Sequence, residues 1–92
     1  MAPPASDTPM RLRVKLFATY REIVGVKDVA WTAEPGTTLG EFLDAFLGRH
    51  PRLAAHRDTM MLAVNQAFAD PAQVLRDGDE IALLPPVSGG AR

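Results

Sequence analysis

The sequence has no cysteine and few histidines. Its 92 residues include two histidines, His50 and His56, and no thiol. This composition excludes disulfides, thiolate metal sites and cysteine nucleophiles within the chain. Two histidines are too few for a histidine-based metal site without several carboxylates, so we expect no metal centre and no bound cofactor.

The sequence also lacks a charge imbalance and a long apolar run. Ten basic residues face 11 acidic ones, a formal net charge of −1, which gives no electrostatic reason to expect nucleic-acid binding. No apolar stretch approaches the ~20 residues that span a bilayer. The N-terminus has neither a basic start nor an apolar stretch, so it does not resemble a signal peptide. We expect a cytoplasmic protein with no nucleic-acid or membrane partner.

The remaining composition predicts one small domain. A chain this short buries only about 60–65% of the surface that it exposes when unfolded, so a deep catalytic cavity is not expected. Residues 1–9, with three prolines and small polar side chains, predict a disordered leader. We expect residues 10–84 to form the folded domain and residues 85–92 a flexible C-terminal tail.

Two strands are predicted near the start of the domain. From Met10 to Leu16, apolar residues alternate with Arg11, Arg13 and Lys15, the period of a strand with one buried face. Residues 19–25 predict one helical turn that Gly25 closes. Residues 26–32 predict a second strand, a hairpin partner of the first.

The clearest helix follows a turn at residues 34–36. Thr38 and Glu41 form a capping-box pattern, and the apolar residues behind them share one helical face. These are Leu39, Phe42, Leu43, Phe46 and Leu47. Gly48 and Pro51 bracket the end, so a helix is predicted over residues 39–49.

The second half of the domain predicts strands at 60–64, 67–69 and 80–84, with turns at 65–66 and 77–79. Residues 52–59 are predicted to be irregular or to form a second short turn. Strands interspersed around one main helix predict an α+β fold with the helix laid across a sheet. The pattern does not determine which strands are neighbours.

Two of these strands are apolar on both faces. Residues 60–64 and 81–84 do not alternate, although a strand with one wet face should. The additional apolar residues indicate a second apolar face of the sheet that serves as an interface, to which Leu84 contributes. Burial inside a larger homo-oligomer is the alternative explanation.

The C-terminal tail has an unusual build. Pro85 and Pro86 end the last strand and stiffen the root of the tail into an extended path. Gly89 and Gly90 follow Val87 and Ser88, and glycine permits the closest approach of a backbone to a partner. In an arbitrary protein such an end is a flexible terminus. Here, an extended proline segment followed by glycines without side chains suits insertion into a narrow tunnel on another protein.

These residues carry a resemblance to a known family. The turn Asp77-Gly78-Asp79-Glu80, followed by Pro85-Pro86-Val87-Ser88-Gly89-Gly90, closely resembles the C-terminus of the ubiquitin-like sulfur carriers that act as small subunits of molybdopterin synthase. Ala63-Val64-Asn65-Gln66 is similar to the third-strand motif of that family, and Leu16-Phe17-Ala18 with Arg21-Glu22 and Gly25 is similar to its first strand and turn. The resemblance covers about residues 10–90.

The resemblance implies a β-grasp fold, in which a mixed sheet wraps one helix, and a sulfur carrier of molybdenum cofactor biosynthesis. It implies that a ubiquitin-activating-type adenylyltransferase activates the terminal carboxylate of Gly90 with ATP, and that a sulfur donor converts it to a thiocarboxylate. The tail, residues 85–89, would then enter a large catalytic subunit. The carrier would supply no catalytic side chain of its own.

The sequence departs from the family pattern at its end. Ala91 and Arg92 follow Gly90, whereas the implied chemistry needs a carboxylate on glycine. Either a processing peptidase removes both residues, or this copy works differently, or it is inactive as a carrier.

Other charged residues have structural interpretations. Arg11, Arg13 and Lys15 are the wet face of a strand or, alternatively, a docking surface for an acidic partner. His50 and His56 are interpreted as capping or surface residues, and Asp77 and Asp79 as turn residues rather than metal ligands. Trp31 is expected in or beside the core.

Two rival functions fit a tail that ends in glycine. One is a sulfur carrier for another pathway, such as thiamin, cysteine or tRNA thiolation. The other is a ubiquitin-like conjugation or interaction module that never bears sulfur.

Overall fold

The computed structural model describes residues 9–86. The predicted leader, apart from Pro9, and the tail beyond Pro86 lie outside the described residues. The strands are β1 (Met10–Leu16), β2 (Asp28–Ala33), β3 (Met61–Val64), β4 (Ala67–Phe68) and β5 (Glu80–Leu84). The helices are α1 (Ala18–Val24), α2 (Leu39–Arg49), α3 (Pro51–Ala54) and the short 3-10 helix η2 (Arg57–Thr59).

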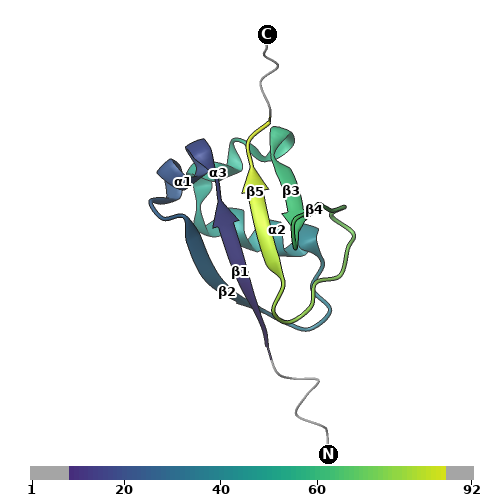
Figure 1. The fold of residues 1–92 in the computed structure, drawn as a ribbon. Coiled ribbons are helices and arrows are strands. Elements are labelled where there is room, and N and C mark those ends of the chain that lie inside the picture. The colour runs from purple at the N-terminus through teal and green to yellow at the C-terminus, as the bar shows by residue number, and fades with distance from the viewer. Residues whose placement is uncertain (1–8, 87–92) are drawn as a thin grey trace, which may run out of the picture.

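The strands form one mixed sheet in the order β2-β1-β5-β3-β4. β1 and β5 run parallel at its centre, and the other neighbouring pairs are antiparallel. Figure 1 shows α2 running across the far face of this sheet. The predicted α+β fold is therefore confirmed, and the arrangement is that of a β-grasp.

The main helix has the bounds that its sequence predicts. Thr38 Oγ1 accepts the Glu41 N–H at 3.2 Å, and Glu41 Oε1 accepts the Thr38 N–H at 3.0 Å. This reciprocal capping box satisfies two backbone donors at the start of α2. The five apolar residues of the predicted stripe are all buried.

The helical content elsewhere exceeds the prediction. α1 has seven residues rather than one turn, and Gly25 ends it with φ 97°, where its N–H donates to the Arg21 carbonyl. Tyr20 anchors α1 in the core at 1% exposure, and burial raises the pKa of its hydroxyl. α3 and η2 are short helical turns in the segment that was predicted to be irregular or to form a second short turn. None of the helices within residues 9–86 is both long and apolar enough to cross a lipid bilayer.

The core lies between the sheet and α2. Several core residues have no exposed surface, among them Val14, Ile81 and Leu83 of the two central strands, and Leu39 and Phe46 of α2. Trp31 packs at the core edge, with its ring centre 5.2 Å from that of Phe46. Its predicted place is confirmed.

Asn65 ties the β3–β4 turn to the start of β5. It has φ 52° and Gln66 has φ 72°, the left-handed pair that a tight hairpin turn requires. Asn65 Nδ2 donates to Asp79 Oδ1 at 2.9 Å, and its Oδ1 accepts the Glu80 N–H at 3.0 Å. One side chain thus holds the loop that aligns β5 with β3.

This arrangement predicts opposite effects at the two turn positions. Asn65→Ala should lower the free energy of unfolding by about 1–3 kcal/mol, because it removes both hydrogen bonds and leaves part-buried Asp79 short of a donor. Gln66→Gly should raise it by up to about 1 kcal/mol, because glycine tolerates positive φ. Urea unfolding measures both. A loss below about 0.5 kcal/mol for Asn65→Ala, the range of an ordinary surface change, would contradict this role.

Candidate functional site

The sheet has two apolar faces, one of which is not covered by α2. Along β5, Ile81 and Leu83 are fully buried, whereas Ala82 and Leu84 keep part of their surface exposed. Because successive side chains of a strand point to opposite faces, Ala82 and Leu84 lie on the face away from the core. We call this face the outer face. The predicted second apolar face therefore exists, and Leu84 lies on it.

An apolar patch occupies one part of the outer face. A shallow depression of about 330 Å³ lies among apolar side chains, with polar ones beside them. We define its apolar members as the outer patch: Phe17, Ala63, Phe68, Ala82 and Leu84. Phe17 is 42% exposed and Phe68 is 73% exposed. Phe68 thus exposes most of its surface to water beside further apolar side chains. Such an exposed apolar cluster is typical of a protein-binding surface.

Neighbouring strands assemble the outer patch. Phe68 of β4 pairs with Ala63 of β3, and Ala63 pairs with Ala82 of β5. Directly paired residues share a face of the sheet, so these three side chains form one row. Phe17 directly follows β1, and its neighbour Leu16 pairs with Leu83. The parallel pairing of β1 and β5 thus brings Phe17 and Leu84 to the same end of the sheet.

The tail leaves the domain beside this patch. Pro85 is half-buried and Pro86 is exposed, directly after Leu84. Neither proline has a backbone N–H, so neither can continue the ladder as a donor. The predicted roles of Val87, Ser88, Gly89, Gly90, Ala91 and Arg92 fall outside the described residues and stay predictions.

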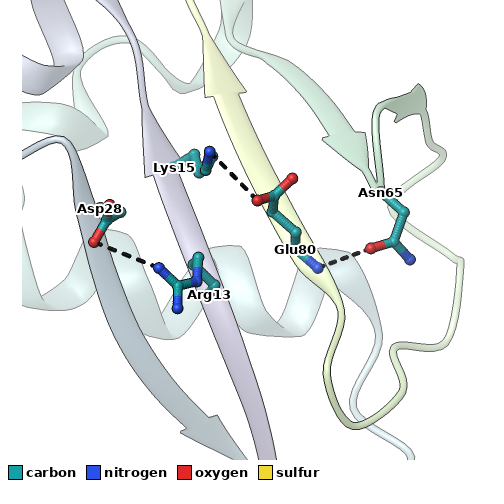
Figure 2. Close-up of polar contacts among 5 residues, drawn as sticks. All are labelled: Arg13, Lys15, Asp28, Asn65 and Glu80. Atoms are coloured by element: carbon teal, nitrogen blue, oxygen red, sulfur yellow. Dashed lines mark hydrogen bonds and ion pairs between the residues drawn. The ribbon is translucent and has the colours of Figure 1, made fainter.

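The other part of the outer face is charged and internally paired. Arg13 lies 4.0 Å from Asp28 and Lys15 lies 3.5 Å from Glu80. Figure 2 shows both ion pairs, each joining neighbouring strands. Arg11 lies 3.9 Å from Asp77. Exposed pairs such as these contribute at most about 1 kcal/mol each to stability. They leave little unbalanced positive charge for an acidic partner, which favours the interpretation of this row as a wet strand face.

The acidic residues beside Gly78 stabilise a turn by accepting hydrogen bonds. Asp79 accepts from the Arg76 N–H as well as from Asn65, and Asp77 Oδ1 accepts from the Arg11 N–H at 2.7 Å. Gly78 has φ 90°, a conformation that glycine adopts at low cost. Across residues 9–86 no group of three His, Asp or Glu side chains is placed to hold a metal ion.

The two histidines pack against aromatic rings. His50 ends α2, with its ring centre 4.6 Å from that of Phe46, and His56 lies 5.5 Å from the ring of Tyr20. The structure places them at separate points of the helical layer, which agrees with structural roles.

Two members of the outer patch, Phe17 and Phe68, were not predicted as interface residues. Phe17 was noted only inside a motif and Phe68 only inside a short predicted strand, whereas Ala63 and Ala82 belong to the two strands that were predicted to be apolar on both faces. The signal for Phe17 was its break in the alternation of β1, which puts a large apolar side chain where a polar one is expected.

Comparisons with known proteins agree with the class that this geometry defines, a ubiquitin-like β-grasp domain. The sequence model of the ThiS family matches residues 14–90. The chain belongs to the ThiS family.

Named relatives share most of its length. The molybdopterin synthase sulfur carrier subunit of Chlamydomonas reinhardtii is 35% identical over 83 residues, which cover 88% of this chain and all of the relative. The crystal structure of SAMP1 from Haloferax volcanii is 35% identical, covers 87% of this chain and 99% of its own, and superposes with a TM-score of 0.77.

A third similarity involves an assembly. The complex of subunits 1 and 2 of the molybdopterin-converting factor from Helicobacter pylori contains a chain that is 30% identical to this one. The match covers 88% of this chain and 100% of that one, with a TM-score of 0.66.

The opposite orientations of Leu83 and Leu84 predict different effects on stability. Leu84→Asp should change the free energy of unfolding by less than about 1 kcal/mol, because the Leu84 side chain lies on the outer face and keeps part of its surface in water. Leu83→Ala should cost about 2–5 kcal/mol, because it opens a cavity in the core. Equal losses for the two variants, measured by urea unfolding, would show that the faces of β5 are wrongly assigned.

Proposed function

We propose that this chain is a sulfur carrier that acts as the small subunit of a molybdopterin synthase-type complex in molybdenum cofactor biosynthesis. The observation that carries the proposal is the family match from residue 14 to residue 90, which extends through both glycines of the tail. The molybdopterin synthase sulfur carrier subunits among the relatives support the same pathway.

Sulfur would be carried at the end of the chain. A carboxylate on Gly90 attacks the α-phosphorus of ATP on a separate adenylyltransferase, which forms an acyl-adenylate and releases pyrophosphate. Sulfur at the sulfide level, supplied by a separate donor, then attacks the acyl carbon. A C–S bond forms, the bond from the acyl carbon to the phosphate oxygen breaks, AMP leaves, and a thiocarboxylate remains. Activation is needed because a carboxylate oxygen is a poor leaving group until it becomes part of a mixed anhydride with phosphate, from which AMP can leave. The chain has no cysteine, so no side-chain thiol competes for the sulfur.

The outer patch is the proposed contact with the large catalytic subunit. It adjoins the root of the tail, so one docking event can seat the domain and direct residues 85–90 into the partner. Phe17, Phe68 and Leu84 would lose their remaining exposed surface there, and burial of aromatic side chains is a common source of binding energy. The carrier positions its tail and contributes no catalytic side chain.

A carboxylate on Gly90 requires cleavage of the chain after Gly90. Ala91 and Arg92 follow it, and the family match ends at residue 90. We propose that a peptidase removes these residues before activation.

A second function is favoured by one specific similarity. The relatives include Small archaeal modifier protein 1 from Haloferax volcanii, at 36% identity over 84 residues. A modifier would join Gly90 to a lysine amine rather than to sulfur. An isopeptide bond between Gly90 and a lysine of another protein, found by peptide mass spectrometry, would favour that function.

The tail proposal predicts that Gly89 is needed for activation and not for stability. In a chain that ends at Gly90, Gly89→Val should leave the free energy of unfolding within about 0.5 kcal/mol, because residue 89 follows the last strand. Adenylate and thiocarboxylate formation should fall steeply, because a narrow tunnel has no room for a branched side chain. Gly89→Ala is the smaller control and should fall less. Normal activation of Gly89→Val would refute tail insertion.

The docking proposal predicts a loss of affinity that is confined to the outer patch. Leu84→Asp should weaken binding to a molybdopterin synthase large subunit by about tenfold or more in isothermal titration calorimetry, because it buries a charge in an apolar contact. Val74→Asp is the matched control, since Val74 is 54% exposed and does not belong to the outer patch. Its affinity should not change. Equal affinities for the two variants would place the contact elsewhere.

A further inference from the structure

β2 forms a free edge of the sheet. It stands first in the strand order, and among the described residues its one strand partner is β1. Figure 1 shows it at the side of the sheet opposite β4. Edge strands are commonly blunted by lysine, proline or a bulge. β2 contains neither lysine nor proline, and its pairing with β1 runs through six consecutive positions without a bulge.

The hydrogen bonds of β1 show which groups of β2 remain unpaired. The Leu16 N–H donates to the Lys27 carbonyl at 2.8 Å, and opposite residues of an antiparallel ladder alternate between bonded and non-bonded pairs. The pair Val14–Val29 is therefore bonded, and the pair Arg13–Ala30 is not.

The other side of β1 leads to the same result. The Arg13 N–H donates to the Asp79 carbonyl, and the Arg11 carbonyl accepts from Gly78. These groups point toward β5 and away from β2. Ala30 and Thr32, which pair with Arg13 and Arg11, consequently present their own N–H and C=O groups to the free edge.

A groove runs beside this edge, between β2 and α2. It has a volume of about 650 Å³, and both elements line it. Trp31 and Ala33 contribute from β2, and Phe42 and Ala45 contribute from α2. A strand added to β2 would direct alternate side chains into this groove.

The charge of the groove determines which charge a strand added by a partner should carry. Its charged lining residues are Glu34, Glu41 and Asp44. Asp44 is paired with Arg57, and one oxygen of Glu41 accepts the capping N–H of Thr38. Arg49 lies over Trp31, 5.4 Å from the ring centre. Neither Glu34 nor Glu41 makes an ion pair with a described residue, and together they outweigh the single positive charge of Arg49, so the groove keeps a net negative charge.

We propose that the β2 edge is a second docking site, which takes an extended basic segment of a partner protein as an added strand. Backbone bonds to Ala30 and Thr32 hold the segment. One of its apolar side chains rests against Trp31 and Ala45, and an Arg or Lys two residues away reaches Glu34 and Glu41. This site is separate from the outer patch and the tail, so it does not depend on the proposed function.

A labelled peptide tests the site. The probe is fluorescein-labelled Thr-Val-Thr-Arg-Thr-Val-Thr, in which valine and arginine share one face, and the control peptide has Glu in place of Arg. The full chain should bind the probe with saturable fluorescence anisotropy in the micromolar range and bind the control at least about tenfold more weakly. The amide resonances of Ala30 and Thr32 should shift when the probe is added.

Variants of the edge separate this site from others. Ala30→Pro removes an edge-facing N–H without removing a bond to β1, and it should weaken probe binding by about tenfold or more. Ala30→Val keeps that N–H and should bind like the parent chain. Glu34→Lys, which leaves the strand itself unchanged, should weaken binding severalfold and remove the preference for Arg over Glu.

Three results would overturn the proposal. One is the absence of saturable binding at about 1 mM probe. Another is binding that neither Ala30→Pro nor Glu34→Lys weakens; Glu34→Lys decides alone if the proline variant does not fold. The third is self-association that Ala30→Pro abolishes in analytical ultracentrifugation, which would assign the edge to a second copy of this chain.

Discussion

Parallel pairing of β1 with β5 places the first and last strands of the domain side by side at the centre of the sheet. Val14, Ile81 and Leu83 are completely buried there against α2. Because the two strands run in the same direction, they end together. Phe17 and Leu84 therefore line the same depression, and the prolines at the root of the tail directly follow Leu84. The pairing that builds the core therefore also places the outer patch beside the root of the tail.

The outer face combines two opposing requirements. The β1 side of this face is kept in water by pairs of opposite charge, Arg13 with Asp28 and Lys15 with Glu80. The β3, β4 and β5 side exposes Phe68 and part of Leu84. Exposed apolar surface lowers solubility, and such patches typically mark a site where a partner binds. The boundary between the two halves runs along Lys15 and Glu80, which both line the depression of the outer patch. A partner that docks on the patch has to accommodate this ion pair, and burial of such a pair contributes more to specificity than to affinity.

Local sequence signals predicted much of the fold. The bounds of α2 follow from its capping box and apolar stripe, and β1 and β5 follow from their patterns and flanking turns. α1 was predicted too short, because its stability comes from the buried side chain of Tyr20 rather than from helical periodicity. The antiparallel pairing of β1 with β2 was predicted and is confirmed. The parallel pairing of β1 with β5 could not be predicted from local patterns, since most of the chain separates the two strands.

The candidate site could be predicted only in part. β5 is apolar at successive positions, where a strand with one wet face would alternate. This pattern can be read from a single strand, and it pointed to Leu84. Phe68 contributes through its pairing with Ala63 across the β3–β4 turn, which follows from the register of two strands. The edge of β2 was not anticipated either, because a free edge is a property of the whole sheet.

The central claim, that sulfur is carried on Gly90, is tested most directly by the intact mass of the protein isolated from its native cell. The account predicts a chain that ends at Gly90, with a fraction in which one carboxylate oxygen is replaced by sulfur. A functional thiocarboxylate on Arg92, or a chain that keeps Ala91 and Arg92 while molybdenum cofactor is being made, would contradict it.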